Sequence, residues 1–371
     1  MSSGNDENIM RAALGLAKRG LGRVWPNPSV GCIITDKNGH VAGRGFTADG
    51  GRPHAETRAL AMAGKAAEGG VAYVTLEPCA HHGKTPPCAE ALINAGLKRV
   101  VVATQDPDAR VAGRGIDMLK AAGITVDFGL CQAEADQINQ GFFHKVRLKR
   151  PLVTVKLATS RDGYIAGPPG HSQWVTGIQS RKRGHLLRAS HDAIMVGIGT
   201  ALADNPSLDC RLPGLADRSP VRLVVDSHLR LPLDNILVTT ARDIPTWVIT
   251  AEPQDSVRAQ RLKDQAVEII SCPVDEAGRI DLSKALALLA EKGISRLLSE
   301  GGAQLNASLI KASLVDRILW FRSTNIIGEG GIAALSGWKL AQLEEMPGFE
   351  IVARGQCGKD TWQEMKVKDR H

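Results

Sequence analysis

Three side chains of the kind that bind zinc follow one another in the chain: His54, Cys79 and Cys88. One imidazole and two thiolates leave the fourth tetrahedral position of a zinc ion open for water, whereas a structural site would use four protein ligands. Zinc lowers the pKa of its bound water from about 15.7 to about 7. Glu56 lies two residues beyond His54 and could accept that proton. The pattern therefore predicts hydrolytic chemistry, and the alternative is a structural zinc knot or a set of unrelated polar residues.

The order of these residues is typical of zinc-dependent nucleobase deaminases, in which an H-x-E motif precedes a Pro-Cys pair and the glutamate is not a ligand. The spacing departs from that pattern, because eight residues separate the two cysteines where two are usual. The strings PNPSVGCII (26–34), PHAE (53–56) and TLEPCAHHGKTPPC (75–88) resemble the bifunctional deaminase–reductase family of riboflavin biosynthesis. The resemblance covers essentially the whole chain.

The resemblance implies two reactions on one phosphorylated pyrimidine. The first domain would hydrolyse the 2-amino group from a pyrimidine that carries a phosphoribosylamino group, and the second would reduce the ribose to a ribityl chain with NADPH. It also implies that Asn27 contributes to the pyrimidine pocket, although a plain turn asparagine is the alternative. Lys84 is a candidate for the substrate phosphate, because its ammonium is a point cation in the zinc loop; a solvated loop lysine is the other interpretation.

Two strand–glycine–helix patterns in the second half of the chain could cradle phosphates. Gly197-Ile198-Gly199-Thr200 follows an expected strand, and Ser299-Glu300-Gly301-Gly302 follows another. The free N–H groups and the dipole at a helix N-terminus attract anions. A short glycine motif is weak evidence when it stands alone, so these residues indicate two anion cradles and no particular reaction.

The segments 156–163, 172–174, 186–208 and 299–309 resemble the dihydrofolate-reductase-like domain of the same family. By position, the resemblance implies NADPH contacts at Ala158, Trp174, Thr200, Asp204, Ser227, Gly302, Ala303, Gln304, Leu305, Asn306, Ala307 and Ser308. It implies that the substrate is held by Lys156, Ser172, Arg188, Leu208, Arg211 and Glu300, with Lys156 facing the reacting sugar. The chain departs from the family pattern at Asn205, Asp209 and Cys210, where an aspartate and threonine-like residues are expected.

Four of these assignments have a structural alternative. Trp174 could be a core aromatic residue, and Asp204 could be a helix cap or turn residue. Arg188 and Arg211 could form surface salt bridges.

The elements that must position these residues form two α/β domains. At 371 residues the chain is long enough for two cores, and the charged segment 145–151 marks a boundary between domains 1–148 and 149–371. Hydrophobic periodicity predicts strands at 30–35, 41–46, 71–76, 99–104, 124–128, 152–158, 193–196, 222–225, 246–250, 267–271, 296–299 and 315–321. It predicts helices at 6–18, 53–67, 88–95, 113–122, 132–144, 178–190, 256–265, 281–292 and 303–312. We expect a cytidine-deaminase-like α/β/α sandwich followed by a dihydrofolate-reductase-like α/β domain.

Composition limits the partners. Seven cysteines without a framework spacing argue against a disulfide scaffold, and neither a leader nor a long apolar run is visible, so a soluble cytoplasmic enzyme without a membrane partner is expected. The formal charge of +7 could suggest nucleic acid, but only 4% of residues are aromatic, so a phosphorylated substrate and a phosphate-bearing cofactor explain the charge more simply. We also expect a homo-oligomer joined through the second domain.

Two rival hypotheses remain. The chain could be a deaminase of a nucleoside or RNA base with a non-catalytic second domain, which NADPH oxidation by the pure protein would exclude. It could also be a zinc-stabilised RNA-binding module, in which replacement of Glu56 by glutamine would cause no loss of function.

Overall fold

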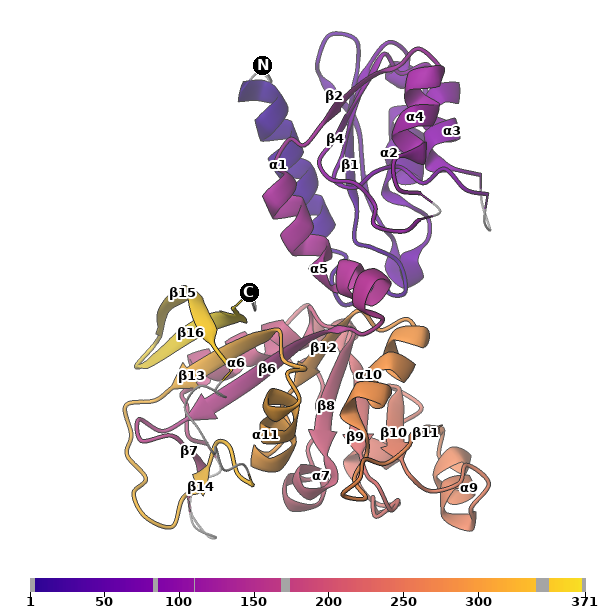
Figure 1. The fold of residues 1–371 in the computed structure, drawn as a ribbon. Coiled ribbons are helices and arrows are strands. Elements are labelled where there is room, and N and C mark those ends of the chain that lie inside the picture. Colours follow the sequence, from indigo (N-terminus) through magenta and orange to yellow (C-terminus); the bar gives the residue numbers. More distant parts are fainter. Residues whose placement is uncertain (1–3, 83–85, 110, 168–173, 338–346, 369–371) are drawn as a thin grey trace. The chain divides into compact units, whose positions relative to one another are not determined.

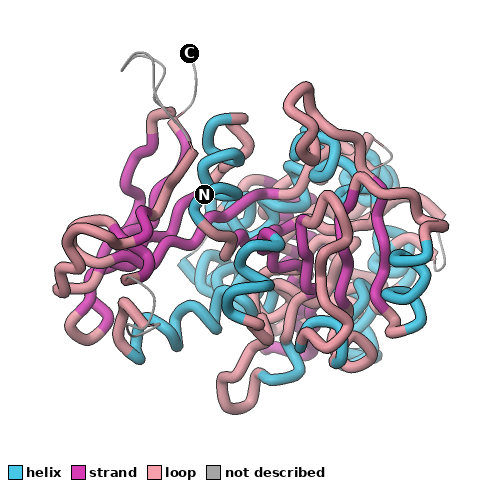
Figure 2. Tube along the Cα trace, turned by 90° about the horizontal axis from the view of Figure 1, so that it is seen from below, coloured by secondary structure: helices cyan, strands magenta, loops and turns pink. Residues whose placement is uncertain are grey.

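A computed structural model describes residues 4–82, 86–109, 111–167, 174–337 and 347–368. The chain divides into two compact units, Met1–Lys149 and Arg150–His371, and this division falls one residue from the boundary expected from the sequence. Figure 1 labels most of the elements of both units, and Figure 2 distinguishes helices from strands along the chain.

The first unit is a five-stranded sheet between two layers of helices. The sheet has the order β2-β1-β3-β4-β5, in which β1 pairs antiparallel with β2 and β3, and β3, β4 and β5 are parallel. Its strands are β1 (Gly31–Thr35), β2 (Val41–Phe46), β3 (Val71–Val74), β4 (Arg99–Val102) and β5 (Thr125–Phe128). Its helices are α1 (Gly4–Lys18), α2 (Ala55–Ala63), α3 (Cys88–Asn94), α4 (Arg114–Ala121) and α5 (Gln132–Leu148).

Each face of this sheet has its own apolar core. Residues of α1 and α5 pack against Ile33, Tyr73 and Val101, whereas residues of α2, α3 and α4 pack against the alternate strand positions on the opposite face. Successive strand residues point to opposite faces, so one set of buried strands supplies both cores. This arrangement confirms the expected α/β/α sandwich.

The second unit is built on a nine-stranded sheet of order β11-β10-β9-β8-β12-β6-β13-β16-β15. The first seven of these strands are parallel, and β16 and β15 form an antiparallel hairpin at one edge. The strands of this sheet are β6 (Leu152–Thr159), β8 (Ala193–Gly197), β9 (Val221–Val225), β10 (Thr246–Thr250), β11 (Val267–Ser271), β12 (Arg296–Ser299), β13 (Arg317–Arg322), β15 (Phe349–Cys357) and β16 (Asp360–Val367). Two further strands, β7 (Tyr164–Ala166) and β14 (Ile332–Ala333), form a separate two-stranded sheet. The helices are α6 (Ile178–Arg188), α7 (Ile198–Asp204), α8 (Ile236–Thr239), α9 (Val257–Asp264), α10 (Leu282–Glu291) and α11 (Ala303–Lys311).

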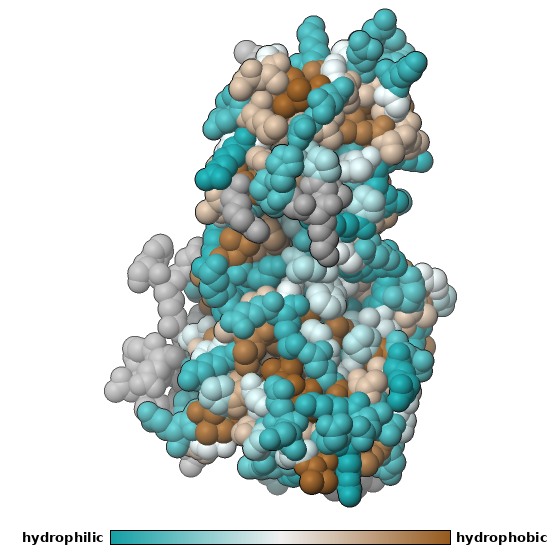
Figure 3. Space-filling view, turned by 90° about the vertical axis from the view of Figure 1, so that its right-hand side faces the viewer, coloured by the Kyte–Doolittle hydropathy of each residue, from teal (hydrophilic) through white to brown (hydrophobic). Residues whose placement is uncertain are grey.

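The structure confirms the expected helices and strands to within a few residues at their ends and adds several that were not expected. The expected helix at 53–67 is α2 followed by a separate 3-10 turn at Gly64–Ala67, because Gly64 adopts a φ of 51° that ends the α-helix. The β15–β16 hairpin, α8 and the small β7–β14 pair were not expected from the sequence. Among the described residues, none of the helices is long and apolar enough to cross a membrane. On the face drawn in Figure 3, hydrophilic residues surround separate apolar areas.

Candidate active sites

Close packing of α2 on β2 brings His54 to the end of the sheet. A Cβ atom at Gly43 would stand 2.1 Å from the carbonyl oxygen of Ala59, and one at Gly45 would stand 2.3 Å from that of Ala55, so only glycine permits this approach. His54 is the residue immediately before α2, and Cys88 is the first residue of α3. Cys79 lies in the loop that follows β3. Two helix N-termini and one strand end therefore supply the three side chains.

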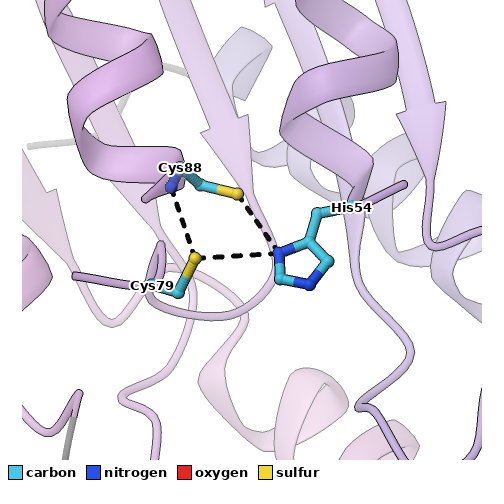
Figure 4. A group of neighbouring side chains, drawn as sticks. All are labelled: His54, Cys79 and Cys88. Carbon is cyan, nitrogen blue, oxygen red and sulfur yellow. Dashed lines mark hydrogen bonds between the residues drawn. The ribbon is translucent and has the colours of Figure 1, made fainter. Parts of the chain in front are cut away.

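The donor atoms of His54, Cys79 and Cys88 all lie within 4.8 Å of one another. His54 Nδ1 is 3.3 Å from Cys88 Sγ and 3.7 Å from Cys79 Sγ, and the backbone N–H of Cys88 donates to Cys79 Sγ at 3.3 Å (Figure 4). One imidazole and two sulfurs at this separation fit the donor set that zinc prefers and leave a fourth position for a non-protein ligand.

The hydrogen bonds around Cys79 favour the ionised form of its thiol. The pKa of Cys79 is lowered to about 4, mainly by the hydrogen bond with the Cys88 thiol. Burial opposes this shift, whereas hydrogen bonds with His54 and with the Cys88 backbone add to it. The same thiol–thiol hydrogen bond raises the pKa of Cys88. Cys79 is thus set up as a thiolate, the form of cysteine that binds metals.

Glu56 is close to the cluster and almost completely buried. Its side chain is 3% exposed, and burial raises the pKa of this carboxyl to about 7, with a further contribution from the charge on Cys79. Asn27 lies on the other side of the imidazole: its Nδ2 donates to the carbonyl oxygen of Gly51 at 2.8 Å and is 3.4 Å from His54 Nε2. The structure therefore brings together all the residues predicted for this site that it describes; Lys84 lies outside the described residues.

Two acidic residues near the cluster were not predicted from the sequence. Glu77 is 3% exposed, and its carboxylate accepts hydrogen bonds from four backbone N–H groups, at Asp106, Gly113, Gly115 and Ile116, over 3.0–3.3 Å. It thereby attaches the start of α4 to the loop of Cys79. Burial raises the pKa of Asp106 to about 7. The signal for Asp106 was available, because β3 and β4 are parallel and the segments after them leave the same edge of the sheet.

In the second unit, the predicted substrate residues Lys156, Arg188 and Glu300 form one ionic cluster. Arg188 donates to the two carboxylate oxygens of Glu300 at 2.8 and 3.0 Å, and Lys156 Nζ lies 3.5 Å from the same group. Burial alone would raise the pKa of Glu300, but the positive charges of Arg188 and Lys156 outweigh burial and lower it to about 2. The side chain of Arg188 is only 15% exposed, so its salt bridge with Glu300 is largely buried and does not lie on the surface.

The two glycine turns predicted as phosphate cradles face each other. The strands before them, β8 and β12, are parallel neighbours, so both turns leave the same edge of the sheet. Thr200 Oγ1 lies 3.0 Å from the position that a Cβ atom on Gly302 would occupy, so this glycine keeps the N-termini of α7 and α11 close together and open. The arrangement fits the phosphate groups of a dinucleotide.

Most of the other predicted cofactor residues lie around this edge. Ala158 is two residues from Lys156 on β6 and shares its face, and Ser227 follows the end of β9. Gln304 is exposed and Leu305 and Ser308 are half-buried, whereas Ala303 and Ala307 are buried. A direct contact from Asn306 does not fit, because its side chain is 2% exposed and bonds Ser299 and the Gly301 carbonyl, both at 2.8 Å. Asn306 instead braces the turn.

The segment after α7 carries further predicted residues. Asp204 is exposed at the end of that helix, and Leu208 is buried with a φ of 54°, so only its backbone can face a ligand. Arg211 is 59% exposed, with Nε 3.5 Å from Asp209 Oδ1. Trp174 is 60% exposed with the guanidinium of Arg181 4.7 Å from its ring centre, which shows that the core alternative is wrong. Ser172 lies outside the described residues.

Two protein-family models match this chain, and they match different parts of it. A family model described as the cytidine and deoxycytidylate deaminase zinc-binding region matches residues 3–104, and one described as the RibD C-terminal domain matches residues 151–349. Fold and site thus define a two-domain enzyme that joins a zinc-binding deaminase domain to a dihydrofolate-reductase-like domain.

Relatives match over nearly the whole length. The riboflavin biosynthesis protein RibD of Bacillus amyloliquefaciens is 40% identical over 357 residues, which cover 96% of this chain and 94% of that protein. The structure of Acinetobacter baumannii RibD matches with a TM-score of 0.87 at 35% identity, and that of the Thermotoga maritima deaminase/reductase with 0.85 at 33%; each match covers 98% of this chain and 99% of the other. The chain belongs to the RibD family. The family resemblance and fold class expected from the sequence are confirmed.

Proposed function

We propose that this chain catalyses two consecutive steps of riboflavin biosynthesis on one phosphorylated pyrimidine. Residues 1–148 would deaminate a diaminohydroxyphosphoribosylaminopyrimidine, and residues 149–371 would reduce the resulting 5-amino-6-(5-phosphoribosylamino)uracil to its ribityl form; both compounds are those in the name of the Thermotoga maritima enzyme. The observation that carries the proposal is the convergence of His54, Cys79 and Cys88 beside the buried Glu56 in a chain of this family.

In the deaminase site, His54, Cys79 and Cys88 would hold one zinc ion. Bound zinc activates water for attack on an amino-bearing ring carbon. Glu56 lies next to the cluster and is shielded from solvent, so its carboxylate can take up a proton from water and return it to the departing amine. Asn27 would hold an edge of the pyrimidine, and Lys84 would meet the substrate phosphate.

In the reductase site, NADPH supplies the hydride that reduces the sugar. Gly302 and the N-terminus of α11 would receive cofactor phosphate, and Ala158, Trp174, Thr200, Asp204 and Ser227 would line the cofactor. Lys156 would face the reacting sugar carbon, with its ammonium fixed by Glu300. Ser172, Arg188, Leu208 and Arg211 would hold the rest of the substrate, with Arg211 on its phosphate.

One assay tests both halves. Purified protein is incubated with the diaminopyrimidine substrate, with and without NADPH, while ammonia release and NADPH oxidation are followed. We expect ammonia without NADPH, and NADPH oxidation only after deamination or with the deaminated substrate. Ammonia release without any NADPH oxidation would favour a deaminase with a non-catalytic second domain.

We further propose a cytoplasmic homo-oligomer joined through the second domain. The seven cysteines form no disulfide in the structure, as is usual in proteins of reducing compartments. The nine-stranded sheet ends at β15, where Ile351 and Val352 are 52% and 48% exposed, and an uncovered strand edge favours association. Sedimentation of the full chain and of residues 150–371 would show whether both form the same oligomer.

A further inference from the structure

The segment Asn205–Arg211 (the 205–211 loop) is held by hydrogen bonds with other parts of the second unit. Asn205 Oδ1 accepts the backbone N–H of Ile236 at 2.8 Å. Further contacts fix the middle of the loop: Arg222 Nη1 donates to the Ser207 carbonyl at 3.3 Å, Arg188 Nη1 to the Asp209 carbonyl at 2.9 Å, and Cys210 N–H to Ser219 Oγ at 3.0 Å. The loop is therefore positioned before any ligand binds.

His185 holds the last residue of the loop, Arg211, by a hydrogen bond to its backbone. It lies on α6, one turn before Arg188, and is half-buried. Its Nδ1 is 3.3 Å from the backbone nitrogen of Arg211, which donates to it, and 3.2 Å from the carbonyl oxygen of Asp209. One ring nitrogen thus lies between a backbone donor and a backbone acceptor.

This geometry makes the contact depend on the protonation state of the ring. A backbone N–H has a fixed direction, so Nδ1 can accept from Arg211 only when it carries no proton. With a proton on Nδ1, the ring would donate to the Asp209 carbonyl and would present one N–H to another at Arg211. The neutral tautomer with its proton on Nε2 holds Arg211 through Nδ1. The charged ring has a proton on Nδ1 in every case and cannot hold it.

The charges around His185 favour the neutral ring. Burial, followed by the positive charges of Arg188 and Arg211, lowers the pKa of His185 below its ordinary value of 6.5. The Asp209 carbonyl and the carboxylate of Glu300 act in the opposite direction. Because the folded-state pKa is lowered, the neutral contact is complete above pH 6.5 and is lost as the pH falls through the lowered pKa.

We propose that His185 is a positioning residue of the reductase site: its neutral Nδ1 fixes the backbone of Arg211, and thereby the place where that guanidinium meets the substrate phosphate, and its protonation releases this end of the loop. The inference rests on the proposed function, because it takes Arg211 as the phosphate ligand. In this proposal His185 acts through the backbone of Arg211 and not through a contact of its own with substrate or cofactor.

The test compares two variants of the full chain with the deaminated phosphorylated substrate. His185→Asn keeps an acceptor oxygen near the place of Nδ1, whereas His185→Leu removes the acceptor. Loss of one hydrogen bond of ordinary net strength predicts that His185→Leu raises KM for this substrate by about 2- to 12-fold at neutral pH, with His185→Asn within about twofold of wild type. The KM for NADPH should not change in either variant.

A double-variant cycle separates positioning from a general loss of structure. In an Arg211→Ala background, His185→Leu should have no further effect on KM, because the guanidinium that it positions is absent. A second measurement follows the ratio of wild-type KM to His185→Asn KM as the pH is lowered from about 7.5. The substrate phosphate, whose second pKa is about 6, titrates in both proteins, so a rise of this ratio at acid pH reports His185 alone.

Several results would overturn the inference. They are an unchanged KM in His185→Leu, an equal loss in His185→Asn and His185→Leu, a parallel rise in the KM for NADPH, or an undiminished His185 effect in the Arg211→Ala background. A flat KM ratio across the acid range in which the enzyme is stable would overturn release on protonation. If the wild-type chain oxidises no NADPH with this substrate, the proposed function fails; if it does but Arg211→Ala is neutral, only the phosphate role of Arg211, and with it that of His185, fails.

Discussion

The backbone N–H of Cys88 donates a hydrogen bond to Sγ of Cys79, over 3.3 Å from nitrogen to sulfur. The first residue of α3 therefore binds the side chain of a second predicted metal ligand and favours its thiolate form. Because both residues also offer sulfur to the same cluster, the eight-residue insert between them is closed by a contact at its two ends. A change at either cysteine should disturb the cluster and the start of α3 together.

We expect purified protein to contain about one zinc ion per chain and Cys79→Ser to lose it, because serine replaces a soft thiolate by a hydroxyl that zinc binds poorly. Deaminase activity should disappear with the metal. Elemental analysis of both proteins, with Cys357→Ser as a control in the other unit, measures this. Full zinc content in Cys79→Ser would show that the ligand assignment is wrong.

Glu56→Gln should keep zinc and fold normally but lose about two to four orders of magnitude in deamination, because a neutral amide cannot carry the proton. Reduction of the already deaminated substrate should remain near the wild-type rate, since that site lies in the other unit. Ammonia release and NADPH oxidation, measured separately, check this. A joint loss of both activities would contradict the assignment of two independent sites.

Glu77→Gln should destabilise the first unit strongly. Each carboxylate oxygen of Glu77 now accepts hydrogen bonds from two backbone N–H groups. In glutamine one of these oxygens is replaced by an amide nitrogen, which cannot accept, so two of the four N–H groups would lose their partner. Two unsatisfied buried donors at about 1–3 kcal/mol each predict a loss of about 2–6 kcal/mol in the free energy of unfolding. Chemical denaturation measures the loss of stability, and hydrogen exchange at the amides of Gly113–Ile116 shows whether it is centred on these groups. Glu68→Gln, at an exposed position of the same unit, serves as the control and should change stability by less than about 0.5 kcal/mol.

The metal cluster and most of the fold could be predicted from the sequence because their signals are local. His54 and Glu56 lie two residues apart at the start of a helix, and the strands β1, β3 and β4 are continuous buried runs. The β15–β16 hairpin had a local signal only at its turn, where Gly358 adopts a φ of 66° between residues 349–357 and 360–367. That signal is weak because β15 is largely exposed and β16 is mostly half-buried, so a core-forming pattern is missing.

The supporting residues could not be predicted, because their roles come from contacts between distant parts of the chain. Glu77 bonds backbone groups 29 to 39 residues away, and His185 meets Arg211 across 26 residues. Nothing in the sequence near either residue distinguishes it from a surface glutamate or an ordinary helix histidine. Only the folded topology shows which backbone N–H groups lack partners and which side chain reaches them.

Glu300 should make the second unit sensitive to acid. Its pKa falls from an ordinary value of 4.5 to about 2 in the folded protein, so its ion pairs stabilise the fold above pH 4.5 and this contribution is lost as the pH falls through about 2. The shift corresponds to about 3 kcal/mol at most. Glu300→Gln should therefore unfold more easily than wild type at neutral pH, and the difference should shrink toward pH 2. Thermal unfolding of both proteins across this range measures it, and a difference that does not vary with pH would contradict the ion-pair explanation.

Arg211→Ala should separate the substrate phosphate from the cofactor. The Arg211 side chain is exposed, and its Nε lies 3.5 Å from Asp209 Oδ1. The rest of the guanidinium can therefore receive a phosphate in the proposed site. A charge-assisted contact with a phosphate contributes roughly 1.5–3 kcal/mol, which predicts a loss of about 10- to 150-fold in kcat/KM. Part of the loss should fall on kcat if the phosphate also orients the sugar.

The KM for NADPH should be unchanged in Arg211→Ala. A dephosphorylated substrate should be turned over almost equally by both proteins, because it has no phosphate to bind. Steady-state NADPH oxidation with the two substrates measures these effects. Weaker NADPH binding with unaltered use of the phosphorylated substrate would place Arg211 in the cofactor site instead.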